Sequence, residues 1–116
     1  MDTEPTALPD TITFDDFLKV DVRVGEIVKA ESVPKSDKLL KLEVYFGELG
    51  TRTIMAGIAK CYANPVGQRA LFVVNLAPRK MMGVESHGMV LAGHDPATGY
   101  VALTTCDSVP TGTRVG

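Results

Sequence analysis

The chain has 116 residues, of which 45% are hydrophobic and 22% charged; this predicts one folded domain with its own core and excludes general disorder. Twelve basic and 14 acidic residues give a formal charge of -2, and that total by itself does not indicate a nucleic-acid partner. Cys61 and Cys106 are too few for a disulfide framework, so a reduced, cytoplasmic setting is expected, although one bridge between them stays open. No signal peptide and no membrane-spanning apolar run are found, so no membrane partner is expected.

The N-terminal part of the chain is predicted to be mobile before the domain begins. Residues 1–12 form an acidic leader in which Pro5 and Pro9 oppose regular structure, and residues 13–116 form the domain. Thr13 and Asp16 have the spacing of a capping box, which predicts a short helix over residues 14–19.

Four strands are predicted in the first two thirds of the chain, from alternating or continuous apolar residues bounded by turn residues. They cover residues 20–28 with a bend or bulge near Gly25, 40–46, 52–56 and 69–76. A turn is expected at 47–50, and residues 58–66 suit a short helix or coil. A final hairpin is predicted from residues 89–92 and 100–103.

Short, closely spaced strands with a bent first strand predict an all-β fold. At this size the natural candidate is a five-stranded OB-fold barrel with short helices and N- and C-terminal extensions. On the pattern alone, an immunoglobulin-like sandwich remains the alternative.

No catalytic, metal or cofactor site is indicated. His87 and His94 are the only histidines, neither lies in a recognised catalytic motif, and with two distant cysteines they do not make a zinc site. No phosphate-binding glycine loop is present. We therefore expect a binding protein and not an enzyme.

The charges are unevenly distributed along the chain, so a local positive surface is possible despite the near-neutral total. Residues 1–18 carry five acids and no base, whereas residues 49–84 contain no acid and five bases. Those bases are Arg52, Lys60, Arg69, Arg79 and Lys80. This interval predicts a positive surface that receives an anion such as a phosphate backbone, because charges act only over about 8–10 Å at physiological salt. Chance, together with core strands that exclude charge of either sign, is the alternative explanation.

Two short segments are the best binding candidates. Residues 75–80 place an amide and two bases where the fourth strand ends, and Pro78 stiffens that exit. Residues 86–89 add a hydroxyl, a glycine and Met89 at the start of the next strand. Together they offer donors to phosphate and an apolar surface for a base or sugar. A turn with Met89 packed in the core is the equally weighted alternative.

Several ordered motifs resemble one known RNA-binding family and run through nearly the whole chain. They are the opening segment 14–25, Ser36-Asp37-Lys38-Leu39-Leu40, Ala56-Gly57-Ile58, the segment 75–81, Ser86-x-Gly88-Met89 and Val109-Pro110-x-Gly112. The family is the tRNA-binding domain shared by the C-terminal extension of methionyl-tRNA synthetase, stand-alone tRNA-binding proteins and the export-related chaperone CsaA. The third-strand segment at Ala56-Gly57-Ile58 is closer to the synthetase branch, with alanine in place of a serine.

The resemblance implies an OB-fold homodimer that binds tRNA by structure, without catalysis, and whose termini contribute to the interface. The expected tRNA-contacting residues by motif are Asn75, Arg79, Lys80, Ser86 and Met89, and charge and strand placement add Lys41, Arg52 and Lys60. A stand-alone protein that assists a methionyl-tRNA synthetase in trans is the leading hypothesis. The alternatives are a CsaA-like chaperone for unfolded export clients and a module that recruits an aminoacyl-tRNA synthetase.

Overall fold

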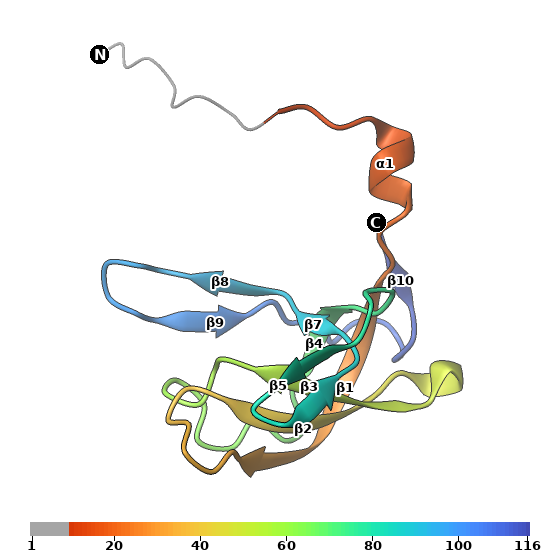
Figure 1. Cartoon of the computed structure of the whole chain (residues 1–116). Coiled ribbons are helices and arrows are strands. Elements are labelled where there is room, and N and C mark those ends of the chain that lie inside the picture. The colour runs from red at the N-terminus through yellow and green to blue at the C-terminus, as the bar shows by residue number, and fades with distance from the viewer. Residues whose placement is uncertain (1–9) are drawn as a thin grey trace.

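The computed structural model describes residues 10–116; residues 1–9, most of the predicted leader, lie outside the described part. The described chain is almost entirely strand and turn, with one α-helix, α1 (Phe14–Leu18), and one 3-10 turn, η1 (Gly47–Leu49) (Figure 1). The strands are β1 (Val22–Ser32), β2 (Leu40–Tyr45), β3 (Thr51–Ala56), β4 (Arg69–Val73), β5 (Arg79–Met81), β6 (Val84–Ser86), β7 (Met89–Val90), β8 (Ala92–His94), β9 (Val101–Leu103) and β10 (Arg114–Val115).

Five strands form a strongly curved sheet in the order β3-β2-β1-β4-β7, and β10 pairs with the start of β1. All of these pairings are antiparallel, and the long β1 contacts β4 through its first half and β2 through its second. The sheet is nearly closed, because the N–H of His87, just after β6, donates to the carbonyl of Thr53 on β3 at 2.8 Å. The predicted all-β, OB-like barrel is therefore confirmed.

The barrel core explains why β1 contains a glycine. The rings of Phe46 and Phe72 meet edge to face at 5.4 Å in the fully buried interior. A Cβ built on Gly25 would lie 2.6 Å from Phe46 and Val44 and 2.9 Å from Phe72. Only a residue without a side chain fits there. The register shift of β1 against β2 comes later, between residues 27 and 29, and not at the glycine.

The structure corrects three strand predictions. Val20 is exposed and precedes β1, and β4 ends at Val73, so residues 75 and 76 are exposed instead of lying in a buried strand. The predicted final hairpin divides into two elements: β7 becomes the fifth barrel strand, and β8 pairs with β9 in a separate hairpin that reaches out from the barrel (Figure 1). Short strands whose partner is distant in sequence carry too little local signal to be assigned.

The β5–β6 hairpin was not predicted. It is joined by Met82 and Gly83, whose φ angles of 51° and 80° are both positive, as a tight two-residue hairpin turn requires. The sequence there shows no glycine or asparagine at the first turn position, which is the usual signal.

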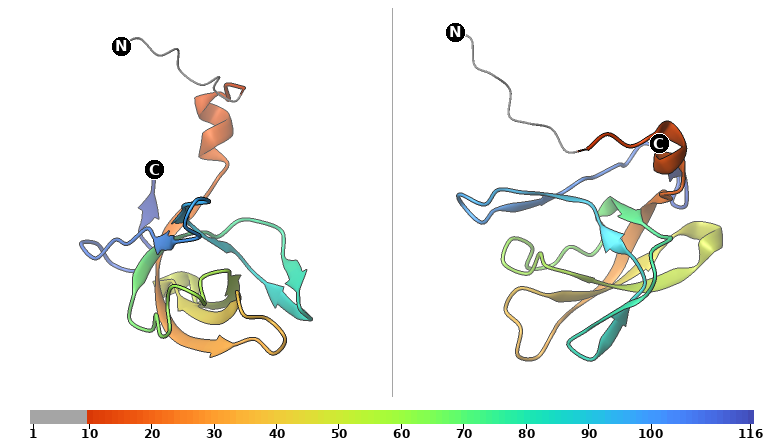
Figure 2. Two further views of the ribbon diagram at one scale, coloured as in Figure 1. Left: turned by 90° about the vertical axis from the view of Figure 1, so that its left-hand side faces the viewer. Right: turned by 45° about the horizontal axis from the view of Figure 1, so that its top comes forward.

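The helix and the C-terminus lie beside each other at one end of the barrel (Figures 1 and 2). The capping box is confirmed: the N–H of Asp16 donates to the hydroxyl of Thr13, and the Asp16 carboxylate accepts from the Thr13 N–H. Arg114 of β10 donates to the carbonyl of Leu18 at 2.9 Å. None of the described helices is long and apolar enough to cross a membrane.

Candidate functional site

A hollow of about 400 Å³ lies between the β5–β6 hairpin and β7. Its lining is mostly apolar, with one guanidinium and one hydroxyl. The lining residues are Met55, Leu76, Ala77, Arg79, Met81, Ser86, Gly88 and Met89. Leu76 and Met89 are 49% and 47% exposed, so this wall offers apolar surface to a ligand and is not a closed core. The alternative in which Met89 packs in the core is thereby excluded.

Arg79 and Lys80 are brought to the hollow unequally. Arg79 and Met81 line it, whereas Lys80 lies between them and therefore on the opposite face of the hairpin, where it pairs in register with Glu85. Glu85 is engaged by His87, whose Nε2 lies 3.0 Å from its Oε1. Neither Arg79 nor Lys80 forms an ion pair with a residue of the described part of the chain. Both cationic ends are exposed and able to meet an anion.

Ser86 lies at the hollow but its hydroxyl is already used. The side chain is buried; Oγ accepts a hydrogen bond from the N–H of Met55 at 3.0 Å and donates to the carbonyl of Gly88 at 3.2 Å. The hydroxyl thus joins β3 to the segment between β6 and β7. Its placement fits a residue that shapes the wall of the site.

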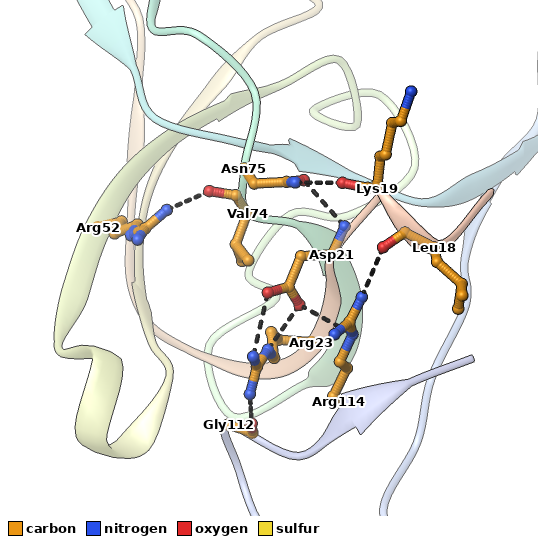
Figure 3. A network of polar contacts seen from close by, with 9 residues as sticks. All are labelled: Leu18, Lys19, Asp21, Arg23, Arg52, Val74, Asn75, Gly112 and Arg114. Atoms are coloured by element: carbon orange, nitrogen blue, oxygen red, sulfur yellow. Dashed lines mark hydrogen bonds and ion pairs between the residues drawn. The ribbon is translucent and has the colours of Figure 1, made fainter. Parts of the chain in front are cut away.

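Asn75 and Arg52 are held in a polar network near the start of β1 (Figure 3). The Asn75 side-chain oxygen accepts from the N–H of Asp21 at 2.9 Å, and its amide donates to the carbonyl of Lys19. The Arg52 guanidinium donates to the carbonyl of Val74. Asn75 therefore fixes the junction between α1 and β1, whereas Arg52 on β3 bonds to the segment that follows β4.

Asp21 is the centre of this network, and sequence reasoning gave it no role. Its carboxylate accepts from Arg23 at 2.6 and 3.0 Å and lies 3.7 Å from Nε of Arg114 (Figure 3). The hydrogen bond from Arg23 lowers the pKa of Asp21, as do the charges of Arg23, Arg114 and Arg52, and together they outweigh the opposing effect of burial. The available signal was the alternation of Asp21 and Arg23 among valines, which places them on one strand face.

The two remaining predicted bases lie elsewhere. Lys41 on β2 is paired in register with Met55, so it lies on the same outer face of the β2–β3 pair, and its other neighbour in register is Glu31. Lys60 is exposed in the turn after β3, with its Nζ 4.0 Å from Asp37, and lines a different hollow.

Residues 10–116 contain no cluster of three or more His, Cys, Asp or Glu side chains that could hold a metal ion. Cys61 and Cys106 are both free thiols and are half-buried. The site is an apolar hollow bordered by the guanidinium of Arg79, an arrangement suited to binding.

Comparisons with known proteins agree with that geometry. The family model described as a putative tRNA binding domain matches residues 22–114. The methionine–tRNA ligase of Methanococcoides burtonii is 51% identical over 96 residues, covering 81% of this chain and 14% of that protein. The ligase of Porphyromonas gingivalis is 44% identical over 110 residues, which is 93% of this chain and 16% of that protein. This chain therefore spans about a seventh of the length of these curated relatives.

Two solved structures match over nearly all of the chain. The MetRS related protein from Pyrococcus horikoshii superposes with a TM-score of 0.85 and 39% identity, covering 93% of this chain and 100% of that one. The chaperone CsaA from Bacillus anthracis superposes with a TM-score of 0.80 and 37% identity, covering 92% and 100%.

Proposed function

This chain belongs to the putative tRNA binding domain family, and on that premise we propose that it binds tRNA without catalysis. The observation that carries the proposal is the hollow beside the β5–β6 hairpin. It combines exposed apolar side chains with the guanidinium of Arg79, and none of its lining residues is acidic. Apolar surface receives bases or sugars, and the cation receives phosphate.

The predicted contact residues take two kinds of role in this proposal. Arg79, Lys80 and Met89 contact the RNA, with Lys41 and Lys60 adding charge beside it. Ser86, Asn75 and Arg52 act as positioning residues, because their polar atoms hydrogen-bond to the backbone of the protein. Loss of a positioning residue weakens binding through the shape of the site and not through phosphate charge.

We further propose that the domain acts as a stand-alone, cytoplasmic homodimer and serves a methionyl-tRNA synthetase in trans. Two solved relatives in which this chain covers the whole of the other chain support a stand-alone role. The apolar side chains of α1 support a dimer, because Phe14 is 73% and Phe17 is 42% exposed. A hollow of about 270 Å³ beside them is lined by both α1 and β10, which fits an interface built from the two termini.

The deciding experiment is a filter-binding titration of unfractionated tRNA at two salt concentrations. The binding constant K is expected to fall as salt rises. Arg79→Ala is expected to make the negative slope of log K against log salt shallower by about 0.7–0.9, the contribution of one phosphate contact. Lys80→Ala is expected to have the smaller effect, because Lys80 lies on the other face of the hairpin. Salt-insensitive binding, or binding that survives Arg79→Ala, Lys80→Ala and Met89→Glu combined, contradicts the proposal.

A second candidate function is peptide binding by a CsaA-like chaperone. The mostly apolar, methionine-containing wall of the hollow favours it, because methionine adapts to irregular apolar partners. Suppressed aggregation of a denatured client, with no retention of tRNA on the filter, would favour this function over the first.

A further inference from the structure

The hollow beside the β5–β6 hairpin is one end of a longer groove. A second hollow of about 250 Å³ shares Met55 and Met89 with it and continues past Gly57 and Val90. A third, of about 270 Å³, shares Gly57, Ile58, His94 and Val101 with the second. The three hollows therefore follow one another along the edge of β3, from the β5–β6 hairpin to the β8–β9 hairpin.

The end of the groove at the β8–β9 hairpin is lined by basic side chains. Lys38, Lys60 and His94 line it together. The carbonyl of Lys38 accepts from the N–H of Ala59 at 3.0 Å, which fixes the Lys38 segment against the turn that carries Lys60. Lys38 makes no ion pair with a described residue, and the contact of Lys60 with the exposed Asp37 is long, so that pair is weak.

Two hydrogen bonds hold the β8–β9 hairpin over this end. The N–H of Val101 donates to Sγ of Cys61 at 3.3 Å, and the N–H of Leu103 donates to the hydroxyl of Tyr62 at 3.0 Å. The hairpin, which stands out from the barrel in Figure 1, is thereby fixed to the turn after β3. The wall formed by His94 and Val101, which pair in register, is thus held by bonds within the protein.

No residue that lines any of the three hollows is acidic, although the chain has 14 acids. The bases lie at the two ends, Arg79 at one and Lys38 with Lys60 at the other, and the middle is apolar. A ligand that matches this distribution carries negative charge at two separated points and flat or apolar groups between them. A nucleic-acid backbone with its bases has that character.

We propose that Lys38 and Lys60 form a second phosphate-binding subsite at the β8–β9 end of the groove, with His94 as a hydrogen-bond donor at its border. This inference rests on the proposed function, because its ligand is the backbone of the same tRNA that contacts Arg79. One RNA segment then lies along the groove and is held at both ends. The subsite adds Lys38 and His94 to the residues that sequence reasoning selected.

The test compares two double variants that each remove two exposed lysines. Lys38→Ala/Lys60→Ala is expected to weaken binding of unfractionated tRNA and to make the negative slope of log K against log salt shallower by about 0.7 or more. The matched control is Lys19→Ala/Lys29→Ala, whose side chains are 80% and 63% exposed and pair with Asp16 and Glu31 outside the groove. The control is expected to keep the slope, and thermal unfolding checks that both variants fold.

The free thiols supply a second readout in the unmodified protein. Cys61 lines the far hollow and Cys106 does not, so bound tRNA is expected to slow maleimide labelling of Cys61 relative to Cys106. Equal slopes for the two double variants, or equal labelling of the two thiols with and without tRNA, overturn the subsite. In that case loss of binding in Arg79→Ala still upholds the proposed function. Absence of salt-dependent tRNA binding by the wild type overturns both.

Discussion

The hydroxyl of Ser86 on β6 accepts a hydrogen bond from the N–H of Met55 on β3, 3.0 Å away, across the seam between the β5–β6 hairpin and the edge of the barrel sheet. With the bond between His87 and Thr53, it is one of the polar contacts by which the segment after β5 closes the barrel. The candidate site lies directly over this seam, and both residues line it. The contacts that close the barrel therefore also form part of the wall of the candidate site.

Ser86→Ala is expected to lower the free energy of unfolding by about 1–3 kcal/mol, because it leaves the buried N–H of Met55 without its partner. Urea denaturation measures the change. Ser108→Ala is the control, because Ser108 is exposed, and it is expected to stay within about 0.5 kcal/mol of the wild type. Equal stability of the two variants would contradict a structural role for Ser86.

Gly25→Ala is expected to cost about 1–3 kcal/mol or more, because the added methyl group overlaps the rings and methyl groups of the core. Gly57→Ala is the matched control, since a Cβ there meets nothing within 4 Å. Thermal unfolding compares the two variants. Equal Tm values for Gly25→Ala and Gly57→Ala would show that the core accommodates the added methyl group without loss of stability, which would contradict the prediction.

The stability of the protein is expected to depend on Asp21 at low pH. Because its pKa in the folded chain lies below the ordinary value of 3.8, the stabilising contribution of Asp21 is present above that value and is lost as the pH falls through the lower, folded-state pKa. Asp21→Asn is therefore expected to be less stable than wild type near neutral pH, and the difference shrinks below about pH 4. Urea denaturation between pH 2.5 and 7 measures it. Asp107→Asn, at an exposed carboxylate, is the control, and a difference for Asp21→Asn that is independent of pH would contradict the role of its charge.

Met89→Glu is expected to weaken tRNA binding at least tenfold, because it places a negative charge on the apolar wall of the groove, while leaving the fold intact. Met89→Leu keeps the apolar surface and is expected to bind within about threefold of the wild type. Filter binding measures both variants. Equal affinities would place the RNA away from β7.

The oligomeric state is expected to depend on the apolar face of α1. Phe17→Ser/Leu18→Ser removes apolar area at the proposed dimer interface and is expected to shift the protein to a monomer in sedimentation-velocity measurements. Leu49→Ser is the control, because Leu49 is 42% exposed, as Phe17 is, but lies at the turn after β2. A wild type that sediments as a monomer would contradict the dimer.

Much of the fold could be predicted because its signals are local. The capping box of Thr13 and Asp16, the alternation along β2 and the apolar run of β4 each lie within a few residues, and the ordered motifs added the OB-fold. The β5–β6 hairpin was missed because its turn uses Met82, and β7 was assigned to the wrong hairpin because two residues carry little pairing signal.

From the sequence alone one could predict the fold class, the acid-free interval of residues 49–84 and the two segments that form most of the first hollow. These features depend on residue types that lie close together in the sequence, so they do not require knowledge of the folded chain. Tertiary contacts were needed to show which polar side chains are already bonded within the protein. Asn75 and Ser86 have the chemistry to contact RNA, but their partners Asp21 and Met55 come from segments distant in sequence and occupy their hydrogen-bonding atoms. In the same way, the barrel brings Lys38, Lys60 and His94 to one hollow, because strand pairing joins segments whose separation along the chain hides their proximity.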